Sequence, residues 1–325
     1  MVAVNPCPTE HLVCPRDKTS LRFTTNKLTC LNDHEYRIVD GIPIMLLQEV
    51  QQTHRAALAS LQMSDCSSPL KTEEPRSASA VDPYVQQAVA GTNGMLYKPL
   101  LGGLSEYPIP DLRLPRSDGA YFLDLGCNWG RWCVAAARLG YYPIGVDPSL
   151  EAILAAKRVA QQLGVQTRYV VADARYLPFA EQTFDVVFSY SVLQHFAKEN
   201  VKITLGEIHR VLKPGGNSLV QMANMYGVRS LYHQIRRGFR EAKDFEVRYW
   251  TLAQLKSTFS GFIGPADISV DGYFSLNPQM AEAHLLPWKY QLVVRASELL
   301  RHLSASIPPM AYFADSLYVH TQRGA

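Results

Sequence analysis

The chain has 325 residues, of which 47% are hydrophobic and 19% charged, with a formal net charge of +3 at pH 7. This length suffices for a full α/β core and a second small module, and the small charge gives no indication of nucleic acid or an acidic membrane surface. The six cysteines are too few for a disulfide framework in a chain of this length. The N-terminus does not resemble a signal peptide, and no run of about 18 apolar residues indicates a membrane span. We therefore expect a cytoplasmic protein.

Residues 1–50 predict a small β-rich unit. Three strand-like runs in it are separated by polar turns: 20–24, 27–30 and 36–39. A unit of this size cannot bury a large core, so it needs a metal, a partner surface or docking onto the rest of the chain. Residues 51–83 predict a helix over 51–64 and then a linker rich in serine, proline and charge.

From residue 84 to 325, strand-like and helix-like segments alternate. The buried strands are predicted at 122–125, 143–146, 168–171, 184–189 and 218–222. The helices between them are predicted at 131–139, 149–163 and 201–212. Strands that alternate with helices are typical of a doubly wound α/β fold with a mostly parallel sheet.

The loop 124–130, Asp-Leu-Gly-Cys-Asn-Trp-Gly, joins the first of these strands to a helix. Its glycines let the backbone turn sharply and approach a ligand. The dinucleotide fingerprint G-x-G-x-x-G is not met, because Asn128 and Arg131 stand at its second and third glycines. There is also no G-x-x-x-x-G-K-[ST] sequence. A nicotinamide, flavin or nucleotide-hydrolysing site is therefore disfavoured.

Two carboxylates follow the next two strands, at the sheet edge where open α/β folds bind ligands. Asp147 can accept both hydrogen bonds of a ribose diol, and Asp173 can accept from the amino group of an adenine. No phosphate cradle is visible, so the ligand predicted is nucleoside-like. The alternative is structural: Asp124 and Asp147 would then only cap the helices that follow them.

Six segments in this order and spacing carry a family resemblance: 122–130, 146–148, 172–174, 177–179, 184–187 and 211–216. They resemble the motifs of class I S-adenosylmethionine (SAM)-dependent methyltransferases, in the type 11 subgroup that includes the ubiquinone and menaquinone methyltransferases. The resemblance covers residues 95–222. It implies a Rossmann-like, seven-stranded, mostly parallel sheet and SAM as the cofactor.

By this resemblance the loop 124–130 borders the methionine end of the cofactor, Asp147 holds the ribose, and Asp173 and Ala174 flank the adenine. Tyr97, which precedes the first strand, is a candidate to close over the cofactor, and the alternative is that it only packs in the core. The expected cofactor-binding residues are Tyr97, Asp124, Gly126, Cys127, Asn128, Gly130, Asp147, Asp173 and Ala174. Asn128 departs from the family, which has glycine there.

His195, just past the fourth strand, is the candidate catalytic base. A histidine near pKa 6.5 can take the proton that an acceptor hydroxyl must lose. The alternative is that it orients a loop or caps a helix. Residues 223–275 are expected to form a substrate lid, and their aromatic side chains favour an apolar or ring-bearing acceptor. The candidate substrate contacts there are Arg236, Arg248 and Tyr249, unless these side chains only face solvent.

Residues 12–47 resemble the zinc-ribbon-like proteins that activate tRNA methyltransferases, most specifically at Asp-Gly-Ile-Pro, 40–43. The zinc-binding members have Cys-x-x-Cys, then a second such pair or Cys-x-x-x-His. Here Asp17 follows Cys14 in place of the second cysteine, while Cys30 and His34 keep the later pair. The altered set favours a module without metal. The alternative is zinc held by Cys14, Asp17, Cys30 and His34, with Cys7 as a substitute ligand.

The function predicted is SAM-dependent methyl transfer to a small-molecule acceptor such as a metabolite, lipid or sugar. One alternative is an rRNA or tRNA methyltransferase whose N-terminal module holds RNA. The weak charge and the lack of a basic stripe with interleaved aromatics in residues 1–50 disfavour it. Another alternative is a non-catalytic SAM-binding subunit that docks a protein partner through the same module.

Overall fold

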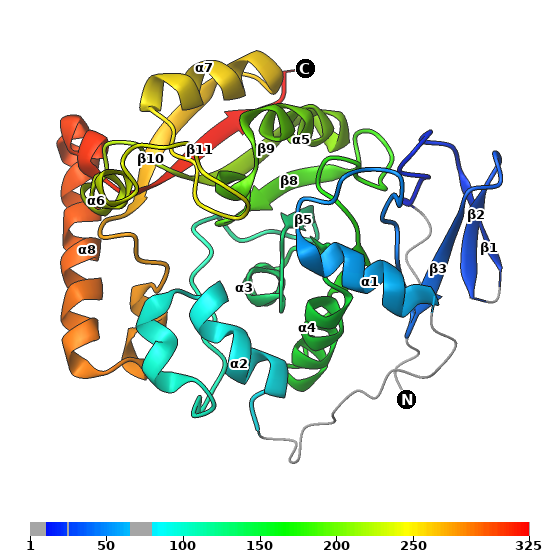
Figure 1. Cartoon of the computed structure of the whole chain (residues 1–325), viewed down its shortest axis with the longest axis horizontal. Helices are drawn as coiled ribbons and strands as arrows, with labels where there is room; N and C mark the ends of the chain where they lie inside the picture. The colour runs from blue at the N-terminus through cyan, green and yellow to red at the C-terminus, as the bar shows by residue number, and fades with distance from the viewer. Residues whose placement is uncertain (1–10, 25, 66–79, 325) are drawn as a thin grey trace.

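A computed structural model describes residues 11–24, 26–65 and 80–324 (Figure 1). Its N-terminal strands are β1 (Leu21–Thr24), β2 (Lys27–Cys30), β3 (Glu35–Val39) and β4 (Ile42–Pro43). They form an antiparallel sheet in the order β1-β2-β3-β4. The three strands predicted in this region agree with β1, β2 and β3 to within one residue. Cys7 and most of the predicted linker lie outside the described residues.

The second sheet has seven strands: β5 (Tyr121–Leu125), β6 (Tyr142–Asp147), β7 (Arg168–Val171), β8 (Phe184–Ser189), β9 (Leu212–Ala223), β10 (Ala266–Gly272) and β11 (Ser316–Gln322). Their order is β10-β11-β9-β8-β5-β6-β7. The pairs from β9 to β7 are parallel, and β11 runs antiparallel to both of its neighbours. The predicted α/β class, with a mostly parallel seven-stranded sheet and a separate small β unit, is confirmed.

Helices cover both faces of this sheet. The helices are α1 (Arg55–Asp65), α2 (Pro83–Thr92), α3 (Arg131–Arg138), α4 (Leu150–Gln162), α5 (Lys198–Val211), α6 (Val228–Arg236), α7 (Leu252–Phe262) and α8 (Trp288–Ser306), with short 3-10 turns η2 (Met95–Leu100), η3 (Leu193–His195), η4 (Met280–Leu285) and η5 (Pro308–Phe313). Figure 1 shows α5 and α7 on one face and α2, α3 and α4 on the other. Among the described residues, no helix is both long and apolar enough to cross a membrane.

The N-terminal sheet is joined to the large sheet at its β7 edge. The backbone N–H of Met45 donates to the carbonyl of Val171 at 2.7 Å, and that of Val13 donates to the carbonyl of Pro178 at 3.0 Å. Leu12 and Leu28 are buried in the same apolar core as Val170 of β7. The small unit therefore covers an edge strand that would otherwise present unpaired backbone groups.

Candidate functional site

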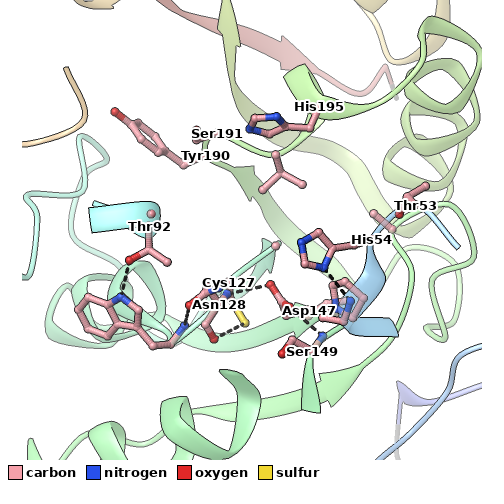
Figure 2. Close-up of a pocket in the computed structure, with 18 of the residues that line it drawn as sticks. Thr53, His54, Thr92, Cys127, Asn128, Asp147, Ser149, Tyr190, Ser191 and His195 are labelled. Carbon is pink, nitrogen blue, oxygen red and sulfur yellow. Dashed lines mark hydrogen bonds between the residues drawn. The ribbon is translucent and has the colours of Figure 1, made fainter. Parts of the chain in front are cut away.

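A cavity of about 490 Å³ opens at the carboxyl ends of β5, β6, β7 and β8. Loops after these strands supply much of its wall, and α2, the segment around His54, the start of α3 and Phe245 also contribute (Figure 2). Of the predicted cofactor residues, six line it: Gly126, Cys127, Asn128, Asp147, Asp173 and Ala174. The predicted base His195 also lines it. The structure thus brings the ends of four strands to one concave site, as the parallel sheet requires.

The loop between β5 and α3 bends through three left-handed residues, the last of which is Gly130. Gly126 has φ +77°, and a Cβ placed on it would overlap the side chain of Val192. Asn128, at the position where the family has glycine, has φ +46°. Asparagine adopts this conformation more readily than most residues with a side chain. The backbone N–H of Asn128 donates to Asp147 Oδ2 at 3.0 Å, so the carboxylate that ends β6 also fixes the loop.

Asp147 lies in the cavity wall with only 8% of its surface exposed. Its other oxygen, Oδ1, accepts from the backbone N–H of Ser149 at 2.9 Å. Two backbone donors thus orient the carboxylate, and each oxygen retains a second lone pair for a ligand. Burial raises the pKa of Asp147 to about 6. The N-cap of α4 is Ser149, whose side chain accepts from Ala152, so Asp147 is not the capping residue.

Asp124 lies behind this wall, because it is not among the residues that line the cavity. Its Oδ2 accepts from the thiol of Cys133 at 3.4 Å, and its buried Oδ1 has no partner among the described residues. Burial raises the pKa of this carboxyl to about 7. The residue therefore stands beneath the loop 126–130, one layer away from the cavity. Gly130, the last residue of the loop, is also outside the lining and directly precedes α3.

Asp173 lines the cavity, but its carboxylate is occupied by an arginine that the sequence did not single out. Arg175 Nη2 lies 2.7 Å from Asp173 Oδ2, and its Nε lies 3.1 Å from Oδ1. Arg175 also donates to the carbonyl of Gln51 at 2.7 Å. The Asp173 side chain is thus paired internally and holds the N-terminal segment beside the cavity, while Ala174 remains in the wall.

Tyr97 does not line the cavity. It is fully buried, and its hydroxyl donates to Glu282 Oε1 at 3.1 Å. The amide of Asn93 donates to the same oxygen, also at 3.1 Å. Tyr97 therefore does not close over the cavity. Its hydroxyl instead binds the buried carboxylate of Glu282, which lies 185 residues later in the chain.

His195 is held in one tautomer. Its Nδ1 lies 2.7 Å from the carbonyl oxygen of Phe245, and a carbonyl only accepts, so Nδ1 carries the proton and Nε2 keeps its lone pair. The ring stacks on the Phe245 ring at 4.0 Å. Burial lowers the pKa of His195, and the charges of Arg248 and His54 lower it further. The imidazole is therefore neutral at pH 7, as a general base must be.

A second histidine, His54, lines the cavity from the segment before α1. Its Nδ1 accepts from the backbone N–H of Ala56 at 3.1 Å, so Nε2 carries the proton. Its ring meets the edge of Phe245 at 4.9 Å. Figure 2 shows the two imidazoles on the same side of the cavity. No pattern in the sequence distinguishes His54, because it lies near the start of the helix predicted over 51–64 and far from the motifs.

The predicted substrate contacts lie elsewhere. None of Arg236, Arg248 and Tyr249 lines the cavity. Arg236 is exposed and lies over the ring of Tyr232, and Tyr249 lies under the guanidinium of Arg237. Arg248 Nη1 donates to the carbonyl of His195 at 2.6 Å and to two carbonyls of its own loop. Arg248 thus fastens the segment that carries Phe245, and Phe245 itself reaches the cavity.

In the N-terminal unit, the four residues named for zinc come together. Their donor atoms all lie within 4.8 Å of one another. His34 Nδ1 lies 3.5 Å from Cys14 Sγ, 3.3 Å from Cys30 Sγ and 3.2 Å from Asp17 Oδ2. The ligands of a tetrahedral zinc ion are separated by about 3.2–3.8 Å, given its bond lengths of about 2.0–2.3 Å. Backbone N–H groups of Asn32 and His34 also point at Cys30 Sγ.

Comparison with known proteins bears on residues 122–216, which match a family model described as a methyltransferase domain. The curated relatives include a ubiquinone biosynthesis O-methyltransferase of Brucella anthropi, which is 37% identical over 115 residues, 35% of this chain and 46% of the relative. An uncharacterized protein of Methanocaldococcus jannaschii is 33% identical over 129 residues, 39% of this chain and 47% of that protein. The chain thus spans about half the length of the curated relatives that it matches.

Similar solved structures include a protein described as a SAM-dependent methyltransferase from Methanosarcina mazei. It has a TM-score of 0.48 and 18% identity, over 66% of this chain and 99% of that one. Another is a complex between the Haloferax volcanii Trm112 methyltransferase activator and a methyltransferase, with a TM-score of 0.46 and 18% identity over 74% and 94%. The methyltransferase domain matched by residues 122–216 implies S-adenosyl-L-methionine as the cofactor.

Proposed function

We propose that this protein is a SAM-dependent methyltransferase that acts on a small-molecule acceptor, with the cavity as its active site. One observation carries the proposal. The same cavity holds an oriented carboxylate, Asp147, and a neutral imidazole, His195, whose acceptor Nε2 has a long contact of 3.5 Å with the side-chain nitrogen of Gln194. The first suits a ribose diol and the second suits an acceptor that must lose a proton.

The cavity fits a nucleoside-like cofactor in both size and chemistry. Its volume of about 490 Å³ lies within the range of small-molecule sites. Asp147 offers acceptors for the ribose hydroxyls, the left-handed bend at Gly126 and Asn128 lets the backbone approach the ligand, and Ala174 lies at the end of β7 for the base. When bound, SAM supplies a methyl group on a sulfonium, and the neutral thioether that remains is an excellent leaving group.

His195 accepts the acceptor's proton at Nε2, because Nδ1 is already bound to the Phe245 carbonyl. The same carbonyl stabilises the imidazolium that forms. Methyl transfer depends chiefly on alignment of donor and acceptor, and the rigid strand ends supply it. The aromatic side chains Trp132, Tyr190 and Phe245 in the wall favour a ring-bearing acceptor. We therefore propose a hydroxyl acceptor, and the Brucella relative is named as an O-methyltransferase.

Calorimetry with S-adenosylhomocysteine, the demethylated product, tests this proposal. We expect Asp147→Ala to weaken its binding by roughly 2–4 kcal/mol, because the ribose hydroxyls lose a buried acceptor pair. The control is Asp267→Ala, at an exposed position of β10 far from the cavity. Equal affinities for the wild type and Asp147→Ala would exclude Asp147 as the ribose ligand.

We further propose that the N-terminal unit is zinc-ribbon-like and holds Zn²⁺ between Cys14, Asp17, Cys30 and His34. The convergence of the four donor atoms supports this over the metal-free module favoured by the sequence. Elemental analysis of the purified protein is expected to give about one zinc per chain, lost in Cys30→Ser and kept in Asp33→Ser, an exposed neighbour. A wild-type protein that stays metal-free after incubation with zinc would refute the site.

A further inference from the structure

Arg131 is a buried cation that the function described so far does not use. It is the first residue of α3 and lines the cavity, yet only 5% of its surface is exposed. Its guanidinium lies over the rings of Trp132 and Tyr190, at 5.2 and 5.4 Å from their centroids. Its Nη1 is buried without a hydrogen bond among the described residues. An arginine carries five N–H donors, and burying them unmet is costly.

Behind Arg131 lies Glu282. The nearest approach is 3.8 Å between Arg131 Nη1 and Glu282 Oε1, an ion pair without a hydrogen bond. Glu282 is fully buried, and its acceptors are used by Tyr97, Asn93 and the backbone N–H of Gln279. The acid thus offsets the charge of Arg131 and leaves the guanidinium donors for another oxygen ligand.

We infer that Arg131 binds the α-carboxylate of the cofactor's methionine part, with Glu282 and Tyr97 as its positioning residues. This inference rests on the proposed function. A planar guanidinium whose Nη1 has no hydrogen-bond partner among the described residues matches a carboxylate in shape and charge. The start of α3, where backbone N–H groups also point outward, adds positive potential at the same place.

The position of Arg131 in the cavity selects the methionine end. Figure 2 shows Tyr190 at the upper left, away from Asp147, the proposed ribose ligand, which lies below the centre of the view. Arg131 lies over Tyr190 and directly follows the loop 126–130. A ligand with its ribose on Asp147 therefore extends its amino-acid tail toward Arg131. A carboxylate on the acceptor could bring the same chemistry to this guanidinium, so the experiment has to separate the two sources.

The test is calorimetry with SAM and with decarboxylated SAM, which differ only in this carboxylate. We expect the wild type to prefer SAM by about 10- to 100-fold, as for a charge-assisted buried pair. In Arg131→Met the preference is expected to vanish, through a loss for SAM alone. The control is Arg138→Met, at the exposed end of the same helix, which should keep the preference.

Each outcome bears on the inference. An undiminished preference for SAM in Arg131→Met overturns the inference. Arg131 would then bind a carboxylate of the methyl acceptor, not that of the cofactor. An equal loss for both ligands also overturns it, because the substitution would then act on the whole site. If neither ligand binds the wild type, the proposed function fails as well, which is a different result.

Tyr97→Phe tests the positioning role, because it removes one hydrogen bond from Glu282 and leaves Arg131 in place. We expect SAM affinity to fall about 2- to 10-fold while the affinity for decarboxylated SAM stays unchanged. A purely structural role for Tyr97 would lower both affinities together, and this pattern would remove Tyr97 from the inference. Thermal melting of each variant shows whether the fold is retained.

Discussion

At the scale of single residues, Asn128 shows how the loop keeps its bend without the glycine that the resembled methyltransferases have there. That glycine permits a left-handed backbone, and Asn128 adopts one at φ +46°. Its side-chain oxygen accepts from the N–H of Trp129 at 2.9 Å, which stabilises the bend. The substitution thus replaces conformational freedom with a local hydrogen bond.

His195 gives a prediction that can be tested without knowing the methyl acceptor. Because burial lowers its pKa below 6.5, the imidazole is expected to remain neutral down to mildly acidic pH, with the proton on Nδ1. Nitrogen-15 NMR of histidine-labelled protein measures both the tautomer and the pKa, and His195→Gln identifies the signal. Catalysis, once an acceptor is known, should fall as the pH drops through that pKa and be flat above it. An Nε2-protonated His195 would remove its role as base.

Asp124 gives a prediction for stability. Its folded pKa of about 7 exceeds the ordinary aspartate pKa of 3.8, so between these pH values the folded protein keeps a proton that the unfolded chain releases. Stability from this group is therefore full below about pH 4 and falls as the pH rises to about 7. Asp124→Asn should flatten that dependence, by an amount on the order of 1–3 kcal/mol. Urea unfolding of the wild type and Asp124→Asn at pH 5 and pH 8 measures this pH dependence. An equal change in the free energy of unfolding for the two proteins would contradict the prediction.

At the scale of elements, the strands β5 to β9 and the helices α3 to α5 were predictable. Buried parallel strands appear as short apolar runs, such as 168–171, which is β7 to the residue. The helix predicted over 149–163 corresponds to α4, with Ser149 as its N-cap and Gly164 just after its end. Motif residues at the strand ends, such as Asp147, follow from the same pattern because their position is fixed by the sheet.

The rest of the site was not predictable, because it depends on pairings between distant segments. Arg131 and Glu282 are 151 positions apart and meet only when η4 packs against α3. Phe245 lies in a segment for which no element was predicted, and His54 lies in the helix predicted over 51–64, so nothing in the sequence places their rings beside His195. Arg248, which was predicted to bind substrate, donates its hydrogen bonds to backbone carbonyls instead. Sequence patterns do not reveal such bonds.

Arg248 leads to a prediction for the loop that it fastens. Its guanidinium donates to the carbonyls of His195, Ala242, Asp244 and Glu246, and Arg248→Ala removes all four bonds. We expect limited proteolysis between residues 240 and 248 to accelerate several-fold, because local opening becomes easier. Arg229→Ala, at an exposed position on α6, is the control and should be cleaved like the wild type. Cleavage of Arg248→Ala at the wild-type rate would show that Phe245 is held by other contacts.

At the scale of the whole molecule, the N-terminal unit is built into the main core. Met45 extends the β7 edge through Val171, and Leu12 and Leu28 share the core of the large sheet. We expect the full chain to unfold in one calorimetric transition. A chain without residues 1–50 should melt lower and self-associate, as seen by light scattering, because β7 becomes an open edge. Two separate transitions, or a monomeric truncated chain with unchanged melting temperature, would contradict this.

The docking on β7 also has a consequence for synthesis. Met45 leaves the ribosome 126 residues before Val171, the partner of its backbone N–H. At about 5–20 residues per second, that interval lasts on the order of 10 s. During it, Leu12, Leu28 and Met45 have no core to enter. The part of the chain made first is thus among the last to find its native neighbours, and a chaperone or metal ion would protect it most in those seconds.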